Sequence, residues 1–549
     1  MSRKRRREEA PPLPEAAAES KTLWALYALA LAVRFAHLFW YRGDFWLTVP
    51  LLDDSIFESW ADLLAKEGWR APSLGAFDFN PAYPYFLAAF RAVFGRSQLV
   101  LFAFQHALGA ATAPLLYLVA RRAFADRGAG LAAGALAALY GPALFFESRL
   151  LGECWIFLAN AAALWLLGRA AGRPWLSWGL GGLCLGVSAV FRPTALAFVP
   201  AVAVWGLWTL RAERRVLAGA AAAFAVGLWL PLLPFQVRNR LVVPQAGWGL
   251  TTSSGGVNLY LGNNPEADGL NQAPSFVRYG PGHEYQDFAD EAGRRLGRPL
   301  SRAEVSSYWS AEVRRFFRER PAEAVRLLGR KAAFFWNHKE PPDNFFLAIF
   351  ERFTKLGPVP LASWGLVGPL GLAGFLWSLA GERRHWLLHA YALSAFAVCL
   401  AFYVLARYRF PAAAGLIPFA GLALARLVEH ARAKAWGKSA ALGGLCAAAF
   451  AFSRLPLIGD EDPGVSHYSM AVIYANRGWK DKALEEYRAS VEAVPTFKAS
   501  WLNMGILLAE LGQNAGAAEA LERAAGLEAD PARKELLADN AARLRGGRP

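Results

Sequence analysis

Residues 51–95 follow the first long apolar run of the chain and read LLDDSIFESWADLLAKEGWRAPSLGAFDFNPAYPYFLAAFRAVFG. The segment opens with two adjacent carboxylates, Asp53 and Asp54, and continues with apolar and charged residues on opposite sides of a helical pattern. Such a segment suits a membrane surface, where its acidic side chains can lie near the lipid headgroups. The function of the chain depends on what these two acids do.

The composition around this segment is that of a membrane protein. The chain has 549 residues, of which 55% are hydrophobic and 19% charged, and it contains 21 Trp and 37 Phe. Several apolar runs are long enough, at about 17 residues or more, to cross the hydrocarbon core as helices. The short alternating segments of a membrane β-barrel are not seen in the sequence. We therefore predict an all-α, polytopic membrane protein.

The net charge of +15 does not indicate a nucleic-acid partner. The basic residues stand mostly in short clusters at the ends of apolar runs, where the positive-inside rule expects them. The four cysteines lie within apolar runs, so we expect them to pack there rather than to form disulfides or bind a metal. They are Cys154, Cys184, Cys399 and Cys446.

The basic loops also predict the topology. Residues 1–21 are expected to be a disordered basic cytoplasmic tail, and about eleven transmembrane helices follow within a membrane domain at 22–459. The predicted spans are 23–41, 99–120, 129–146, 153–167, 175–190, 195–210, 216–235, 356–380, 386–406, 411–427 and 440–458. The last span is the weakest because Arg454 interrupts it, and the side on which the C-terminal part lies depends on it.

This topology places the N-terminus in the cytoplasm and two loops, 42–97 and 236–355, on the exoplasmic side of what we expect to be a bacterial cytoplasmic membrane. The larger loop is polar and includes a stretch at 255–265, GGVNLYLGNNP, that is rich in turn-forming residues and is predicted to be a loop. Helical patterns follow at 284–296, 302–320 and 322–336.

Residues 460–549 contain an internal repeat. Gly478 and Gly512 are 34 residues apart, as are Ala483 and Ala517. This is the tetratricopeptide period, with two helices per repeat, Gly at the turn and small Ala where helices pack. Residues 533–545 are expected to form a capping helix. We expect this domain to lie on the exoplasmic side and to bind an acceptor protein or an assembly partner.

The predicted exoplasmic face gathers acids and arginines from distant parts of the chain, among them Asp53, Arg192 and Arg407. The planar guanidinium group of arginine suits a lipid-linked phosphate near the headgroups. A nearby carboxylate can take a proton from an attacking hydroxyl or amine. Together these groups fit transfer of a sugar from a polyprenyl-phosphate carrier, with the arginines stabilising the departing phosphate.

At these residues the sequence resembles a known group, the GT-C glycosyltransferases, and in particular the family of the protein O-mannosyltransferases and the lipid A aminoarabinose transferase. The matching motifs are Asp53-Asp54 with Phe57 and Trp60-Ala61, Asn80-Pro81-Ala82-Tyr83-Pro84, Phe191-Arg192-Pro193 and Arg407-Tyr408-Arg409-Phe410-Pro411. The stretches at 255–269 and 330–344 resemble bacterial members that carry tetratricopeptide tails. The resemblance covers about residues 22–430.

The resemblance implies an inverting glycosyltransferase with a polyprenyl-phosphate sugar as donor and an exoplasmic acceptor, for which protein hydroxyl groups are the preferred choice. It assigns the base to Asp53; Asp54 stands where many members have Glu and would be a supporting acid. The implied contacts to the donor phosphate are Arg192, Arg407, Arg409 and Tyr408. Residues expected around the substrate are Glu147, Tyr83, Asn263, Lys331, His338 and Glu340.

Simpler roles remain open for these residues. Asp53 and Asp54 could solvate a loop or cap a helix, and Glu147 could pair with Arg149 at the membrane interface. Each arginine could anchor the chain to headgroups. Two adjacent carboxylates could contribute to a divalent-cation site but do not make one, and no His/Cys cluster has metal-ligand spacing.

Two residues inside a predicted span, Gln105 and His106, fit interhelical hydrogen bonding better than catalysis. Tyr83 fits the aromatic belt of a membrane interface better than it fits a sugar-stacking site. For the whole chain, the alternatives are a non-catalytic membrane scaffold that works through its repeats and a transporter of lipid-linked sugar. The sequence shows no paired inverted halves, which argues against transport.

Overall fold

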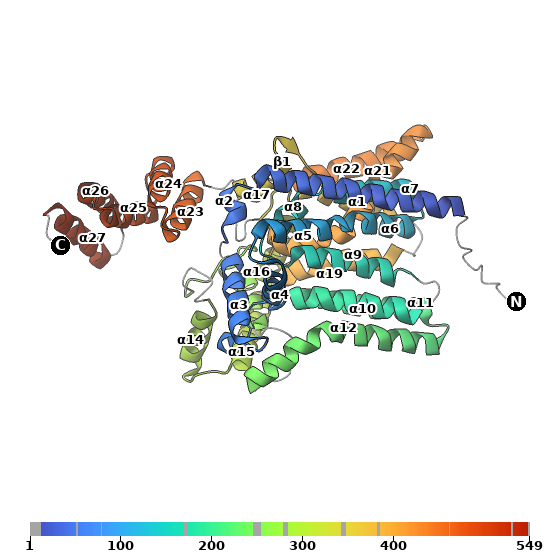
Figure 1. The fold of residues 1–549 in the computed structure, drawn as a ribbon, viewed down its shortest axis with the longest axis horizontal. Coiled ribbons are helices and arrows are strands. Elements are labelled where there is room, and N and C mark those ends of the chain that lie inside the picture. The colour runs from blue at the N-terminus through green and yellow to red at the C-terminus, as the bar shows by residue number, and fades with distance from the viewer. Residues whose placement is uncertain are drawn as a thin grey trace. The chain divides into compact units, whose positions relative to one another are not determined.

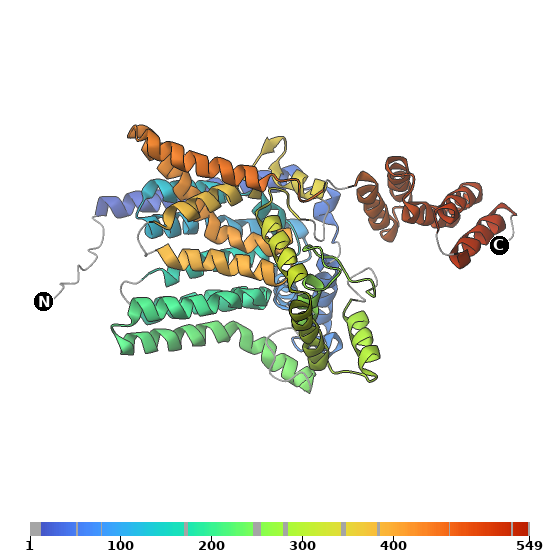
Figure 2. The ribbon, with the colours of Figure 1, turned by 180° about the vertical axis from the view of Figure 1, so that it is seen from behind.

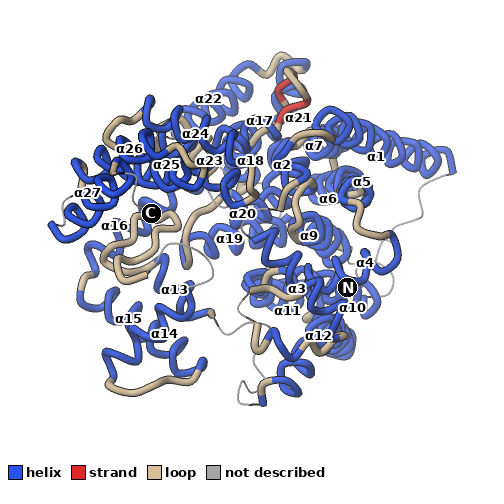
Figure 3. Tube along the Cα trace, turned by 60° about the vertical axis from the view of Figure 1, so that its left-hand side comes forward, coloured by secondary structure: helices blue, strands red, loops and turns tan. Residues whose placement is uncertain are grey.

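A computed structural model describes residues 13–50, 53–77, 79–169, 174–244, 254–277, 284–341, 347–380, 385–459, 462–528 and 531–546. Over these residues the chain consists of helices joined by loops, with one antiparallel hairpin of β1 (Lys355–Leu356) and β2 (Val359–Pro360) (Figure 3). The all-α prediction is confirmed. The chain divides into a larger unit, residues 1–345 and 349–458, and a second unit, residues 346–348 and 459–549.

Among the described residues of the larger unit, six helical segments are long and apolar enough to cross a membrane. They are Ala18–Tyr41, Gln98–Phe124, Pro174–Phe191, Pro193–Leu210, Arg214–Val242 and Ala406–Arg432. The helices that form them are α1 (Leu13–Tyr41), α5 (Gln98–Ala110), α6 (Thr112–Phe124), α10 (Pro174–Phe191), η2 (Pro193–Phe198), α11 (Val199–Leu210), α12 (Arg214–Val242), α20 (Ala406–Arg409), η5 (Phe410–Ala412) and α21 (Ala413–Arg432).

Shorter apolar helices lie among these long ones: α9 (Glu153–Leu167), α18 (Trp364–Ser378) and α19 (Trp386–Ala401). Figures 1 and 2 show α1, α9, α10 and α12 running in roughly the same direction, and α10 packs against both α9 and α12. Helix α22 (Trp436–Ser453) packs against α18 and α21. A helix lies within each of the eleven predicted spans, while the number that cross the membrane stays a prediction.

Short polar residues and prolines set where several helices begin. The Ser97 hydroxyl accepts a hydrogen bond from the Val100 N–H at the start of α5, and Asp126 accepts one from Ala129 at the start of α7 (Arg127–Ala138). These side chains satisfy N–H groups that have no partner inside the first helical turn. Pro193, in the first turn of η2, fits because that position needs no N–H.

Two predicted boundaries near the N-terminal half are wrong. Helix α1 begins at Leu13, so residues 13–21 are helical instead of belonging to a disordered tail, and residues 1–12 lie outside the described residues. The predicted span 129–146 is two helices, α7 and α8 (Gly141–Glu147), with a break at Leu139 and Tyr140. At this break the Gly141 N–H donates to the Ala362 carbonyl at 2.8 Å instead of to its own helix.

Two further predictions are wrong in the second half of the unit. The stretch predicted as a loop at 255–265 forms α13 (Gly255–Gly262), because Val257 and Leu261 are buried against an apolar cluster that includes Trp309. Tertiary packing here outweighs the turn preference of Gly and Asn. The span predicted at 356–380 starts with the β1–β2 hairpin, and its helix begins only at Trp364.

The loops between the long helices carry helices of their own. They are α2 (Phe45–Thr48), α3 (Asp53–Glu67), η1 (Pro72–Leu74), α4 (Ala82–Phe94), α14 (Glu284–Leu296), α15 (Arg302–Glu319), α16 (Pro321–Trp336) and α17 (Leu347–Phe353). The three helical patterns predicted in the larger loop are confirmed as α14, α15 and α16. Helices α3, α14 and α15 lie across one end of the long helices (Figures 1 and 2).

The second unit is a series of paired helices: α23 (Pro463–Asn476), α24 (Lys480–Ala493), α25 (Lys498–Glu510), α26 (Asn514–Gly526) and α27 (Pro531–Arg545). Gly478 and Gly512 occupy the turns at φ 74° and 73°, a region that favours glycine. Ala483 and Ala517 are fully buried where neighbouring helices pack. This hairpin pattern is what the 34-residue repeat predicts, and the tetratricopeptide assignment stays a prediction.

Candidate active site

The first turn of α3 presents Asp53 and Asp54 to the interior of the larger unit. Their exposed fractions are 7% and 4%, so they do not solvate a loop. Both lie in the first turn of the helix, where the helix dipole is positive. The same face of α3 buries Phe57, Ala61 and Leu64, which fixes the helix against the unit with its acids inward.

Each of these carboxylates meets an arginine from another part of the chain. Arg407 Nη1 donates to Asp53 Oδ2 at 2.6 Å across 354 positions of sequence. Arg149, in the loop between α8 and α9, forms an ion pair with Asp54. Since both arginines are themselves largely buried, these pairs lie in a region of low dielectric constant, where charge interactions are strong.

A third carboxylate joins two arginines. Glu153, the first residue of α9, pairs with Arg192, which stands between α10 and η2. The Arg407 Nε atom lies 3.9 Å from the same Glu153 Oε1 atom. Arg192 Nη1 also donates to the Arg407 backbone carbonyl at 2.6 Å, so the two guanidinium groups are held side by side.

These six residues form what we call the acid–arginine cluster: Asp53, Asp54, Arg149, Glu153, Arg192 and Arg407. Three carboxylates balance three guanidinium groups, so the fully ionised cluster carries no net charge. Such mutual pairing is what allows so many charges to be buried together. It also places groups that bind phosphate in direct contact with groups that accept protons.

Tyr408 supports the arginines of the cluster. The Arg192 guanidinium carbon lies 4.9 Å from the centre of the Tyr408 ring, and that of Arg407 lies 6.0 Å away. The Tyr408 hydroxyl is 3.4 Å from the Tyr403 hydroxyl, which in turn reaches Asn258 at 3.4 Å. The ring therefore holds the guanidinium groups by cation–π contact, and the hydroxyl is directed to the large loop.

Burial has a direct effect on the charge of Asp54. The pKa of this carboxyl is raised from 3.8 to about 6, because burial, together with Asp53 and Glu153, outweighs the lowering effect of Arg149 and Arg407. Burial also raises the pKa of Glu284, the first residue of α14, and the Asp53 carboxylate adds to that effect. The larger loop thus brings another acid near Asp53.

An apolar cavity of about 40 Å³ adjoins Arg192 and Tyr408. Its walls come from α9, η2, α19 and η5, and they are mostly alanine and larger apolar side chains such as Ile156, Phe198 and Val398. The Asn160 side chain also lines it, and its Oδ1 atom is buried with no hydrogen-bond partner among the described atoms. The charged cluster therefore borders a space with an apolar lining.

The structure does not bring Arg409 to the cluster. Its guanidinium group is fully buried and donates to the backbone carbonyls of Phe334, Phe335, Asn337 and Lys339 at 2.8–3.1 Å. It also donates to Glu340 Oε2 at 2.7 Å. Arg409 and Glu340 thus hold the C-terminal end of α16, and this geometry does not favour the phosphate contact predicted for Arg409.

Three more residues expected around the substrate lie in similar internal contacts. The fully buried Lys331 Nζ donates to Asn263 Oδ1 at 2.8 Å and to the carbonyls of Leu400 and Phe402. The His338 backbone N–H donates to the Ser453 carbonyl at 2.8 Å. Lys331 and Asn263 therefore tie the large loop to the end of α19, and His338 ties it to α22.

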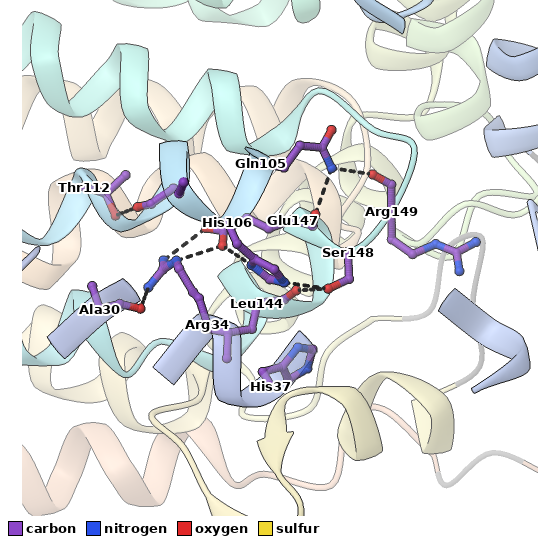
Figure 4. Close-up of polar contacts among 12 residues, drawn as sticks. Ala30, Arg34, His37, Gln105, His106, Thr112, Leu144, Glu147, Ser148 and Arg149 are labelled. Carbon is purple, nitrogen blue, oxygen red and sulfur yellow. Dashed lines mark hydrogen bonds and ion pairs between the residues drawn. The ribbon is translucent and has the colours of Figure 1, made fainter. Parts of the chain in front are cut away.

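Glu147 and Tyr83 also lie outside the cluster. Glu147 accepts from Arg34 at 2.8 and 3.0 Å, and its side chain points away from that of Arg149 (Figure 4), so the alternative of a Glu147–Arg149 ion pair is wrong. The buried Tyr83 hydroxyl donates to Gln105 Oε1 at 2.8 Å. Interhelical hydrogen bonding, expected for Gln105 and His106, is confirmed.

Two members of the cluster, Arg149 and Glu153, were not predicted as site residues. Their signal was present in the sequence: Glu147, Arg149 and Glu153 place three charges at one end of two apolar runs. Charged residues at membrane depth are costly and usually paired, so each of them needed a partner from another loop. Among the described residues, no group of three or more His, Cys, Asp and Glu side chains is arranged to hold a metal ion.

Comparison with protein families matches residues 78–235 to the model described as Dolichyl-phosphate-mannose-protein mannosyltransferase. This part of the chain includes the motif at 80–84, Glu153 and Phe191-Arg192-Pro193. The larger unit, called the membrane unit from here on, resembles the GT-C glycosyltransferases. The match confirms, for this part of the chain, the resemblance that the sequence motifs indicate.

Solved structures similar to the chain include the archaeal oligosaccharyltransferase AglB from Archaeoglobus fulgidus in complex with an inhibitory peptide and a dolichol-phosphate. It is 14% identical, with a TM-score of 0.44, and the match covers 86% of this chain and 60% of that one. The S. cerevisiae protein O-mannosyltransferase Pmt1–Pmt2 complex bound to the sugar donor is also 14% identical, with a TM-score of 0.34 and coverage of 49% and 38%. Comparison with curated proteins finds no match.

Proposed function

We propose that the chain is a membrane glycosyltransferase that moves a sugar from a polyprenyl-phosphate donor to an exoplasmic acceptor, preferably a protein hydroxyl group. One observation carries the proposal: Asp53 and Arg407, 354 positions apart, are in contact at 2.6 Å beside Arg192 and Glu153. A phosphate held by these arginines would lie next to a carboxylate that can act as a base. The family match at 78–235 supports the same class of reaction.

In the proposed reaction, the acceptor hydroxyl attacks the anomeric carbon of the donor sugar from the side opposite the phosphate. The new carbon–oxygen bond forms as the bond to the phosphate oxygen breaks, and Asp53 takes the hydroxyl proton. The electron pair of the broken bond stays on the polyprenyl phosphate, where Arg192 and Arg407 stabilise the added charge. Attack from the opposite side inverts the anomeric centre.

Asp54 assists this base without touching the acceptor. When Asp54 is ionised, its negative charge beside Asp53 attracts the proton that Asp53 takes from the acceptor. Arg149 keeps Asp54 ionised at neutral pH by pairing with it. The supporting role predicted for Asp54 therefore has a physical basis in the cluster.

The apolar cavity beside Arg192 suits a lipid-linked donor. Its alanine-rich and aromatic lining would accept the first isoprenoid carbons, while the phosphate stays with the guanidinium groups. The helical repeats at 460–549 would bind an extended segment of an acceptor protein or an assembly partner, as concave helical repeats do. A protein acceptor follows from these repeats, so it depends on their lying on the exoplasmic side.

The test is a transfer assay in reconstituted liposomes with a panel of labelled polyprenyl-phosphate sugars. We expect Asp53→Asn to lower the transfer rate by about 10²–10⁴-fold, the range for loss of a general base. Asp62→Asn is the matched control, because Asp62 lies on the same helix and pairs with Arg96 outside the cluster. Equal activity of wild type and Asp53→Asn would remove Asp53 as the base, and no transfer from any donor would refute the proposed function.

A further inference from the structure

Gln105 makes three hydrogen bonds inside the membrane unit although it lies on an apolar helix, α5. Its Nε2 atom donates to the backbone carbonyls of Glu147 at 2.8 Å and Arg149 at 3.0 Å. Its Oε1 atom accepts from the Tyr83 hydroxyl of α4 at 2.8 Å. One fully buried side chain thus fixes two backbone positions on either side of Ser148 and joins them to α4.

The Glu147 side chain is fixed as firmly as its backbone. Arg34 of α1 donates from Nε to Oε2 at 2.8 Å and from Nη2 to Oε1 at 3.0 Å, and His106 Nδ1 lies 2.9 Å from Oε2. Figure 4 shows these side chains converging on the carboxylate. The carboxylate fits only because α5 has Gly109 here: a Cβ atom would lie 2.0 Å from Oε1.

Ser148 is held in the same way. Its hydroxyl donates to the Leu144 carbonyl at 2.9 Å and lies 3.1 Å from His106 Nε2. We call Arg34, Gln105, His106 and Glu147 the buried network. Its members come from α1, α5 and α8, and all are at most 1% exposed.

The chain that this network fixes leads directly into the acid–arginine cluster. Residues 147–153 end α8, turn, and begin α9. Arg149 of this turn pairs with Asp54, and Glu153 at its end pairs with Arg192. Burying polar side chains at membrane depth costs free energy. Four such residues that are almost fully hydrogen-bonded therefore indicate a functional role.

We propose that the buried network positions the turn of residues 147–153, and through it Arg149 and Glu153 of the acid–arginine cluster. Its members are positioning residues, since they touch the turn rather than the substrate. The inference rests on the proposed function for its catalytic consequence. The physical reason is geometric: a displacement of about 1 Å in a catalytic group can cost about 10²-fold in rate.

The positioning role predicts a specific pH effect. Arg149 and Arg407 lower the pKa of Asp54, while burial, Asp53 and Glu153 raise it. If the turn loosens, the effects of both Arg149 and Glu153 on Asp54 weaken, and the loss of Arg149 outweighs that of Glu153 because Arg149 has the larger effect. Asp54 then takes a proton at higher pH, and the acid limb of the transfer rate moves upward in pH.

Gln105→Leu tests this, because leucine fills the space and removes all three hydrogen bonds. We expect kcat/KM to fall about 10–100-fold, with the acid limb displaced to higher pH. The matched control is His389→Leu, which removes another buried polar side chain bonded between two helices, at the end of α19 far from Arg407. A loss of activity in Gln105→Leu with an unmoved acid limb would refute the positioning role.

A second measurement does not need activity and separates the inference from the proposed function. Hydrogen–deuterium exchange of the backbone amides of residues 148–153 should be several-fold faster in Gln105→Leu than in wild type, and unchanged in His389→Leu. Gly109→Ala should give the same local change, because its methyl group displaces the Glu147 carboxylate. Unchanged exchange in both Gln105→Leu and Gly109→Ala would overturn the inference even if transfer is observed, whereas faster exchange would support it even if no donor is used.

Discussion

Arg407 and Arg409 come from one short helix, α20, and yet they serve different regions of the membrane unit. Arg407 reaches the carboxylates of Asp53 and Glu153 and keeps 15% of its side chain exposed. Arg409 is fully buried, donates to four backbone carbonyls at the end of α16, and pairs with Glu340. Its guanidinium group also lies 4.4 Å over the Trp364 ring.

The difference lies in what kind of acceptor each arginine meets. A carboxylate is an anion, so a guanidinium group placed to bind it is also placed to bind a phosphate. The carbonyls around Arg409 belong to the last turn of α16 and the residues just after it, where partial negative charge binds a cation as part of the fold. One motif therefore supplies both an anion-binding group for the site and a cation that holds the scaffold.

The largest effect should follow from Arg409→Ala. The substitution leaves Glu340 as a buried charge without its arginine partner and removes one hydrogen bond from each of four carbonyls, and breaking a buried pair in this way costs about 3–5 kcal/mol. We expect a large drop in melting temperature and poor accumulation of folded protein, measured in detergent. A double variant, Arg409→Met with Glu340→Met, should recover much of this stability because no charge is left unpaired. Normal stability of Arg409→Ala would contradict the structural role.

Arg407→Ala should have the opposite balance. We expect transfer to fall by about 10²-fold or more, the scale for losing one group that stabilises charge in a transition state. The melting temperature should change far less than in Arg409→Ala, since Arg407 is partly exposed and Asp53 keeps the favourable N-terminus of α3. Equal losses of stability in the two variants, with no specific loss of transfer, would remove the distinction between them.

The sequence predicts the large features of this molecule well. Long apolar runs with basic ends predict helical spans, and amphipathic patterns predict α14, α15 and α16 within a residue or two. The meeting of Asp53, Arg192 and Arg407 could also be predicted, because the topology puts all three on one face of the membrane. However, neither the length of the apolar runs nor the amphipathic patterns show which of the charged residues on this face contact one another.

The predictions that differ depend on tertiary contacts. The turn formers of 255–262 become helical because Val257 and Leu261 are buried against Trp309. Glu147 was grouped with the outward charges, but the break between α7 and α8 turns it inward to Arg34. Glu153, six positions later, belongs to the acid–arginine cluster instead. No local sequence pattern distinguishes the two glutamates.

The smallest expected effect concerns the charge of Asp54. Changing this charge tests the acid–arginine cluster while both Arg407 and Arg409 stay in place. As pH falls through about 6, Asp54 takes a proton, Arg149 loses its partner, and the negative charge that keeps Asp53 basic is lost. We expect kcat/KM to fall with an acid limb near pH 6 in wild type. Asp54→Asn should lack this limb and be about tenfold slower above it, because the negative charge beside Asp53 is then absent at every pH.

The contribution of Asp54 to the free energy of unfolding should fall over the pH range in which the transfer rate rises. This opposite direction distinguishes the titration of Asp54 from acid unfolding. A carboxyl group whose pKa is raised on folding adds to the free energy of unfolding below its ordinary pKa of 3.8, and that addition is lost as pH rises through about 6. Between pH 4 and 6 the Asp54 contribution to stability therefore falls while activity rises. Melting temperatures of wild type and Asp54→Asn across this range isolate the contribution. An Asp54 contribution that rises together with activity would mean that the acid limb reports folding instead of the charge on this side chain.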